Sequence, residues 1–166
     1  MLFSPDYHEQ LTDRGWDEAW VQARIDRVVA DAIGAVDDRG LWPEHPDDHD
    51  DDFQMPKSVY MGAAGMLWGL HALGHDRPDL IRGLYQSYLR EPDWPGLEPS
   101  YLGGEAGILL VSQLLDPSGG DLDALEDAIR RNAGHPSNEL LWGGPGTMVA
   151  AQAMHAASSE RRWADA

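Results

Sequence analysis

The 166-residue sequence contains no cysteine, which excludes disulfides, zinc–thiolate sites and a cysteine nucleophile within this chain. Basic residues are also scarce: Lys57 is the only lysine, and 12 basic side chains stand against 29 acidic ones, for a net charge of −17. Because that charge repels phosphate backbones and anionic lipid, we expect neither nucleic acid nor a membrane surface as a partner. No apolar run reaches the roughly 18 residues of a membrane span, and the N-terminus has no signal-peptide pattern. We therefore expect a cytoplasmic protein.

Three stretches of the sequence each place two glycines, three positions apart, ahead of an apolar run. They are SVYMGAAGMLWGL from Ser58, SYLGGEAGILLVSQLL from Ser100 and ELLWGGPGTMVAAQAM from Glu139. The first glycines of successive pairs lie 42 and 39 residues apart, a period typical of helical hairpins or propeller blades. The segments are long and rich in Ala, Leu and Met, which favours helices over short strands. The repeat-motif glycines are Gly62, Gly65, Gly104, Gly107, Gly143 and Gly146.

Each period predicts two unlike helices. Apolar stripes at helical spacing over 16–36, 80–88 and 122–129 indicate outer amphipathic helices, whereas 66–73, 108–115 and 147–157 contain no charged residue. A helix that is apolar all round must be surrounded by protein, so these should be inner helices. We therefore expect a single all-α domain over 1–166, in which helical-hairpin repeats form an arc or half of an (α/α) toroid. The repeats are approximately 13–75, 76–116 and 117–157, and 158–166 begins a fourth outer helix.

The order of outer helix, loop, Gly-x-x-Gly motif and apolar helix resembles the lanthionine synthetase C-like (LanC-like) family, from about Asp13 onward. VYMGAAGMLWGL, YLGGEAGILL and NELLWGGPGTMVAAQ carry the resemblance. It implies a toroid of six or seven hairpins and an activity in zinc-dependent addition of a thiol to a dehydroamino acid, or in a related glutathione-linked reaction. The family's zinc ligands, two cysteines and a histidine in later repeats, have no counterpart here. The resemblance thus implies a catalytically incomplete part or short homologue with no cofactor of its own, and zinc in a longer family member.

Two other functions are compatible with the same pattern. Other α/α toroids are glycosidases or epimerases, which use paired carboxylates, and a repeat arc can also be a non-catalytic interaction scaffold. An arc of apolar inner helices exposes them on its concave side and at its open edge, so something should cover that surface. We expect either a second copy of the chain or further C-terminal repeats as partner, with a peptide or a glutathione-like small molecule as ligand.

Candidate site residues gather around the glycine pairs. The glycines either allow close backbone packing or, at converging helix N-termini, favour an anionic group. Glu105 lies between two of them and is the candidate catalytic carboxylate, as an acid/base or ligand-anchoring group. The residues expected to line the rim or a cavity are Tyr60, His71, Trp94, Tyr101 and Trp142.

A second candidate is the acidic loop between the first two predicted helices. Its carboxylates and histidines could hold a divalent cation, and the candidate ligands are His45, Asp47, His49 and Asp51. The spacing does not match an EF-hand, which needs a glycine in mid-loop and a terminal glutamate. A solvated acidic loop that binds no metal is the other reading.

Overall fold

The computed structural model describes residues 15–44, 47 and 55–166, and within these residues the chain is helical, with no strand beyond one isolated bridge between Trp94 and Gly96. This confirms the all-α fold class. In the same residues no helix is both long and apolar enough to cross a membrane. The helices are α1 (Glu18–Gly34), α2 (Ala63–Ala72), α3 (Pro78–Ile81), α4 (Leu84–Arg90), α5 (Glu105–Leu115), α6 (Leu122–Asn132), α7 (Gly144–Ser158) and α8 (Arg162–Asp165).

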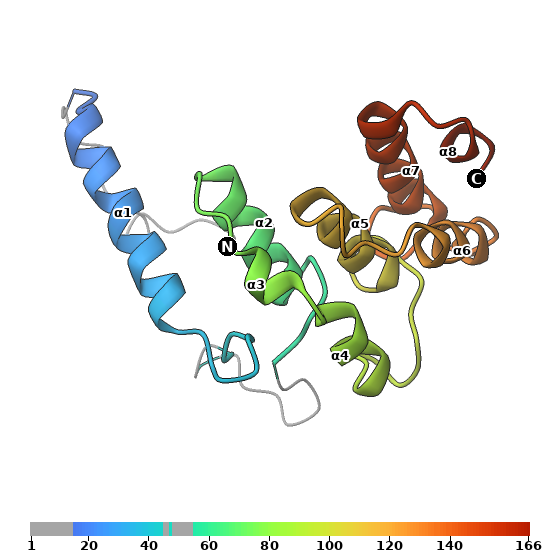
Figure 1. Cartoon of the computed structure of the whole chain (residues 1–166), viewed down its shortest axis with the longest axis horizontal. Helices are drawn as coiled ribbons and strands as arrows, with labels where there is room; N and C mark the ends of the chain where they lie inside the picture. The colour runs from blue at the N-terminus through green and yellow to red at the C-terminus, as the bar shows by residue number, and fades with distance from the viewer. Residues whose placement is uncertain (1–14, 45–46, 48–54) are drawn as a thin grey trace, which may run out of the picture.

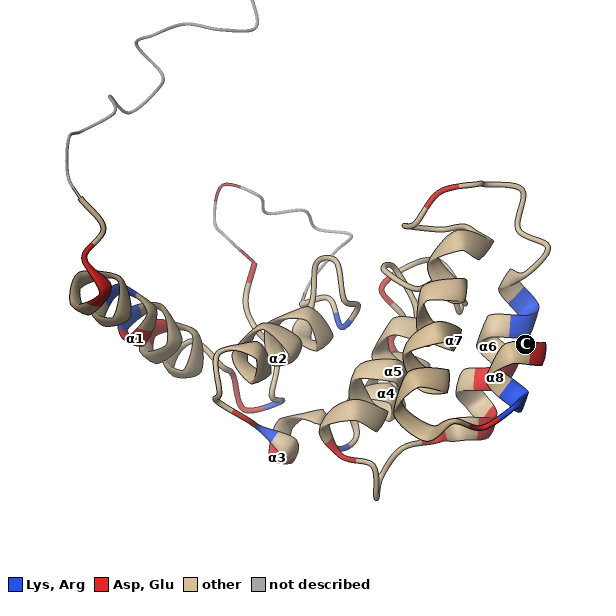
Figure 2. Cartoon of the chain, turned by 90° about the horizontal axis from the view of Figure 1, so that it is seen from above, with Lys and Arg blue, Asp and Glu red and all other residues tan. Residues whose placement is uncertain are grey.

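The helices that follow the glycine pairs lie next to one another in chain order. Helix α5 packs against α2 on one side and α7 on the other, and α1 and α8 lie toward opposite ends of the molecule (Figure 1). The amphipathic helices α4 and α6 cover α5, and α6 also packs against α7. Seen from above, most of the Lys, Arg, Asp and Glu side chains in view lie on α1, α3, α6, α8 and the loops, whereas α2 and α7 are free of these colours (Figure 2).

Helix α5 is the centre of the core. Its residues from Glu105 to Ser112 are all buried. Ile108 and Val111 belong to the apolar cluster formed with α1, α2, α3 and α4, whereas Leu109 belongs to the cluster formed with α6, α7 and α8. One helix therefore joins both halves of the core, because its apolar side chains point in every direction.

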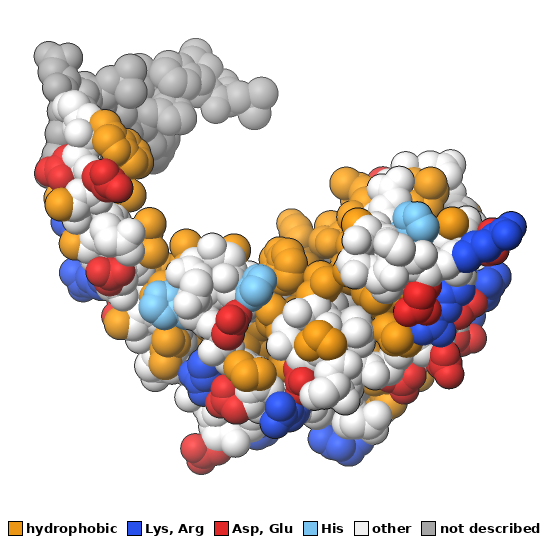
Figure 3. Space-filling model, turned by 45° about the horizontal axis from the view of Figure 1, so that its top comes forward, with side chains coloured by type: hydrophobic (Ala, Val, Ile, Leu, Met, Phe, Trp, Pro, Cys, Tyr) orange, Lys and Arg blue, Asp and Glu red, His pale blue; other side chains and the backbone are white. Residues whose placement is uncertain are grey.

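The two neighbours of α5 are covered on one side only. Met66 on α2 and Met148 on α7 are exposed although both helices lack charged side chains, apart from the histidines His71 and His155. The space-filling view shows a hollowed face with hydrophobic side chains gathered toward its middle (Figure 3). The expectation that every apolar helix is fully surrounded is therefore met by α5 alone among the described helices.

The prediction of one continuous outer helix over 80–88 is wrong. Gly83 has φ of +83°, and Arg82 before it is extended, so the segment divides into α3 and α4. A left-handed residue cannot continue a right-handed helix, and glycine adopts this conformation without the penalty that a Cβ brings. The apolar stripe persists across the break, since Ile81, Leu84 and Tyr88 are all buried.

The starts of α1 and α6 differ from those of the helices that follow the glycine pairs. Asp17 and Asp121 cap α1 and α6, and their carboxylates accept the backbone N–H groups of Trp20 and Ala124. Such caps satisfy the first free N–H groups of a helix. Helices α2, α5 and α7 instead begin at a glycine with no side-chain cap. Their first turns must be satisfied in another way, by the loops described below.

We predict that Gly83→Ala lowers the free energy of unfolding by about 1 kcal/mol, because alanine is strained at positive φ although space is available for its Cβ. The matched control is Gly69→Ala in α2, where a Cβ also meets nothing within 4 Å but the backbone is helical. There alanine should raise stability by about 0.5–1 kcal/mol. Urea unfolding followed by circular dichroism measures both, and an equal effect of the two substitutions would contradict the strain at Gly83.

Candidate functional site

The three loops before α2, α5 and α7 share one backbone arrangement, which we call the glycine rim. In each loop the carbonyl oxygen six residues before the first glycine lies where that glycine's Cβ would be. Added Cβ atoms at Gly62, Gly104 and Gly143 would lie 2.2, 1.8 and 2.0 Å from the oxygens of Pro56, Glu98 and Ser137. The backbone of each loop therefore passes directly over the start of its own helix, and only glycine permits that approach.

The second glycine of each pair meets the same constraint one turn further on. Again the obstructing atom is the carbonyl oxygen six residues earlier. Added Cβ atoms at Gly65, Gly107 and Gly146 would lie 2.0, 1.9 and 2.3 Å from the oxygens of Val59, Tyr101 and Leu140. All six motif glycines thus serve close packing of a loop on the helix that follows it.

The loops also occupy the helix N-termini. The N–H groups of Ala63 and Ala64 donate to the carbonyl oxygens of Pro56 and Lys57, at 3.0 and 3.1 Å. In the next unit the N–H of Glu105 donates to the Glu98 oxygen at 2.8 Å. These donors are already used within the chain, so they are not available to an anion at the starts of α2 and α5.

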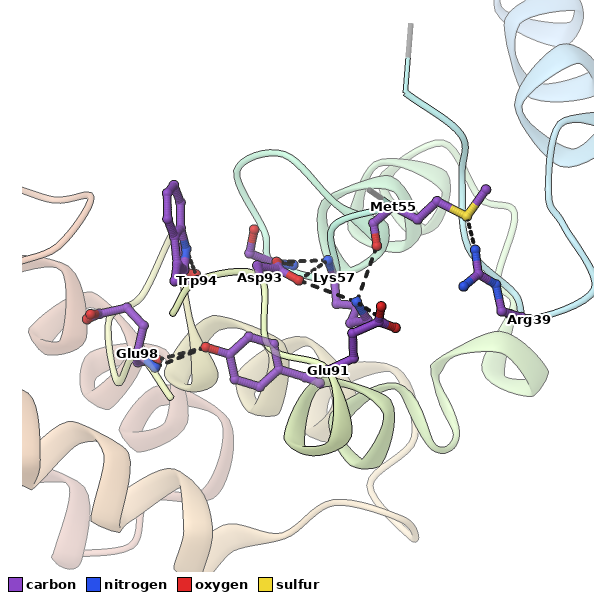
Figure 4. Close-up of polar contacts among 10 residues, drawn as sticks. Arg39, Met55, Lys57, Glu91, Asp93, Trp94 and Glu98 are labelled. Carbon is purple, nitrogen blue, oxygen red and sulfur yellow. Dashed lines mark hydrogen bonds and ion pairs between the residues drawn. The ribbon is translucent and has the colours of Figure 1, made fainter. Parts of the chain in front are cut away.

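A buried ion pair holds the first loop of the rim. The Asp93 carboxylate accepts the backbone N–H groups of Lys57 and Ser58 at 2.8–2.9 Å, and the Lys57 Nζ lies 3.7 Å from it (Figure 4). Lys57 is 2% exposed and Asp93 is also buried. Buried charges are tolerated only when paired in this way, so the pair fixes the first loop to the segment after α4. Sequence reasoning noted Lys57 as the only lysine but did not identify this role.

The second and third loops are held by neutral hydrogen bonds. The Tyr88 hydroxyl accepts the Glu98 N–H at 3.1 Å and donates to the Glu98 carbonyl at 3.4 Å (Figure 4), and burial raises the pKa of Tyr88 to about 12. The Trp94 indole N–H donates to the Gly103 carbonyl at 2.9 Å. In the third loop the Asn132 amide donates to the Trp142 carbonyl at 2.9 Å. Each loop is thus tied to an outer element.

Glu105 is buried and directed toward the outer helices. Its carboxylate accepts the Tyr85 hydroxyl at 2.8 Å from α4 and the Arg131 guanidinium at 2.7 Å from α6. Desolvation raises the pKa of Tyr85, and the hydrogen bond to Glu105 raises it further. The group predicted as a rim acid or base therefore lies 1% exposed between three helices, where it cross-links them.

The predicted rim residues are brought together only in part. The Trp94 and Trp142 rings meet edge to face with centroids 4.7 Å apart, and Tyr101 is half-buried in the core cluster beside α7. Tyr60 is 66% exposed, and its backbone N–H donates to the Leu102 carbonyl of the next loop at 2.9 Å.

His71 lies apart from the rim, in the last turn of α2. Its ring is exposed, Nδ1 is 2.5 Å from the Asp76 carboxylate and the Trp68 ring centroid is 5.4 Å away. His71 therefore lies on an exposed side of α2, and the expectation that it lines the rim or a cavity stays a prediction.

Most of the predicted cation loop is outside the described residues. That applies to His45, His49 and Asp51, whereas Asp47 is described. In the part of the chain that the structure describes, no three side chains of His, Asp or Glu are grouped so that they could hold a metal ion.

Comparison of this chain with protein-family models, with curated proteins and with solved structures finds no match. A function for this chain is therefore inferred from its own contacts.

We predict that Gly104→Ala lowers the free energy of unfolding by about 3 kcal/mol or more, because the new Cβ overlaps a backbone carbonyl that cannot rotate away. Gly34→Ala at the end of α1, where a Cβ meets nothing within 4 Å, is the control and should change stability by less than about 1 kcal/mol. Thermal and urea unfolding measure both, and an unchanged Gly104→Ala protein would refute the packing role.

We also predict that Glu105→Ala lowers the free energy of unfolding by about 3 kcal/mol, because it leaves Tyr85 and Arg131 without their buried acceptor. Asp127 offers a matched control, since it binds the same Arg131 at 2.6 Å but is 66% exposed. Asp127→Ala should cost about 0.5 kcal/mol or less, as exposed helix pairs do. Similar costs for the two variants in urea unfolding would contradict the cross-link.

Proposed function

We propose that this chain forms part of the wall of a LanC-like α/α toroid, and that it acts as a peptide-binding scaffold without thiol-addition chemistry of its own. The observation that carries the proposal is that one unit occurs three times. In each unit a loop crosses the start of a helix at a Gly-x-x-Gly motif, and each glycine packs against the carbonyl oxygen six residues before it. Repetition of a local unit is the physical basis of solenoids and closed helical rings.

The step from one unit to the next also repeats. The residue three positions before the first glycine contacts the second glycine of the following unit. A Cβ added at Gly107 would lie 2.7 Å from Cγ2 of Val59, and one added at Gly146 would lie 3.1 Å from Cβ of Tyr101. The same kind of contact recurs at both steps between neighbouring units, as in a row of helical hairpins, and a row that curves without a rise closes into a ring.

The zinc chemistry of the family does not fit this chain. Its ligand set needs two thiolates and an imidazole, and the sequence contains no cysteine. The described residues also bring no three histidine or carboxylate side chains together. We therefore assign no metal-dependent step to these residues and limit the proposal to binding.

A peptide fits the glycine rim better than a glutathione-like molecule does. Tyr60, Met61 and Leu97 are exposed apolar side chains on the loops before α2 and α5, where they could contact apolar side chains of an extended ligand. Glutathione is a small anion, which a chain of net charge −17 repels, whereas a peptide of positive charge is attracted. The carbohydrate-enzyme alternative has no such support, since Glu105 is already bound by Tyr85 and Arg131.

The test uses a basic peptide with apolar side chains, one cysteine and one dehydroalanine, added with Zn²⁺. We expect it to bind, as followed by tryptophan fluorescence, and its thiol to stay open to alkylation because no thioether forms. Tyr60→Ser and Leu97→Ser should each weaken binding roughly fivefold, as loss of one apolar contact does. Leu89→Ser on the outer helix α4 is the control and should leave binding unchanged. Loss of the free thiol in the presence of the protein would overturn the non-catalytic assignment, and absence of binding would overturn the scaffold.

A further inference from the structure

We propose that two copies of this chain associate edge to edge, with the α2 edge of each copy docked on the α7 edge of the other, so that two arcs of three units close one ring. The proposal rests on the toroid architecture proposed above, but it adds a specific partner and a specific contact. It starts from the way units already pack within one chain.

The α2 edge has an acceptor position that is exposed among the described residues of its own chain. The residues that follow the second glycine in the next two units, Ile108 and Thr147, are buried, whereas the equivalent Met66 is 37% exposed. At Gly65 the three atoms nearest to an added Cβ all belong to Val59 of its own loop, and none to a preceding unit. Gly65 and Met66 therefore form the receiving half of the repeated step.

The α7 edge has the complementary position. Val59 and Tyr101, three residues before the first glycine, are half-buried and contact the glycine of the following unit. The equivalent residue of the third unit is Leu140, which is 54% exposed. Leu140 of one copy is therefore the counterpart that Gly65 and Met66 of a second copy lack, and the contact between copies would repeat the contact between units.

An open groove of about 780 Å³ adjoins this edge. It is lined by the end of α6, by α7 and by α8, with apolar contributions from Pro145, Met148, Ala151 and Trp163. Within the chain α5 is covered by the outer helices α4 and α6, whereas α7 packs against α6 and the short α8. Helix α1 is also an amphipathic outer helix, and its Val28 is 62% exposed. Helix α1 of the second copy is thus the element that we place over this groove.

Charge does not oppose this occupant. No Asp or Glu side chain is among the groove-lining residues, although the chain carries −17 overall. The start of α1 carries Asp17 and Glu18, so it would meet no carboxylate side chain in the groove. The remaining repulsion between two copies is long-range and is screened by salt. The association should therefore strengthen as ionic strength rises.

The test is the mass of the protein in solution, measured by light scattering over a range of protein and salt concentrations. We expect the mass of two chains for the wild type. Met66→Glu and Leu140→Glu, one on each edge, should each give single chains, because the charge would be buried in the contact. Leu89→Glu is the control, since Leu89 is also 37% exposed but lies on α4 away from both edges, and it should remain a pair.

Mixing the two edge variants tests the head-to-tail geometry. Met66→Glu retains an intact α7 edge and Leu140→Glu an intact α2 edge, so the mixture should recover a pair through one sound contact. Far-UV circular dichroism of each variant reports whether it folds. The mixing result then tests the geometry of the contact independently of the mass of the wild type. A wild type of single-chain mass, a pair unaffected by both variants, a mixture that stays monomeric or a ladder of higher masses would each overturn the proposal. The mass is measured without peptide, so the two proposals are tested separately. The chain can be monomeric and still bind peptide at Tyr60, or form a pair and bind no peptide.

Discussion

The structure depends on the close passage of a backbone carbonyl over the start of each inner helix. An oxygen 1.8–2.3 Å from a hypothetical Cβ leaves no room for any side chain, so six positions along the chain must be glycine. The same passage brings loop carbonyls to N–H groups at the starts of α2 and α5, in place of the side-chain caps that α1 and α6 have. A helix that begins this way needs no polar cap, so it can be apolar from its first turn and lie inside the molecule.

Two buried carboxylates, Asp93 and Glu105, hold this arrangement of loops and helices together. Asp93 binds two consecutive backbone N–H groups of the first loop of the glycine rim, while Lys57 compensates its charge. Glu105 does the equivalent between layers, since it joins α5 to α4 and α6. Both carboxylates accept hydrogen bonds from partners within the chain. A carboxylate with all its partners inside the fold contributes to specificity of packing, and a substrate would have to displace one of them to use it.

Periodicity in the sequence was sufficient to predict an all-α fold with apolar helices after the glycine pairs, because those features depend on spacing and composition, but it left the role of the glycines open between packing and anion binding. It was not sufficient for α3 and α4, where one glycine at positive φ interrupts a stripe that is otherwise continuous. Nor could it find the Lys57–Asp93 and Glu105–Arg131 pairs, whose partners are 36 and 26 residues apart and meet only after the loops and helices have docked. The exposure of His71 could not be predicted either, because which side of an apolar helix is exposed depends on the helices that pack against it.

That dependence on neighbours is the basis of the proposed association between two copies of the chain. Three inner helices of similar character have three different environments, because α5 has a unit on both sides while α2 and α7 each have one. A repeat therefore leaves its two ends with complementary unsatisfied surfaces: a glycine-lined receiving site at one and a projecting apolar side chain at the other. Such ends are heterologous, so contact between copies either closes a ring or continues as an open chain. The proposed pair corresponds to the closed case, in which two copies of three units each supply one half of a ring.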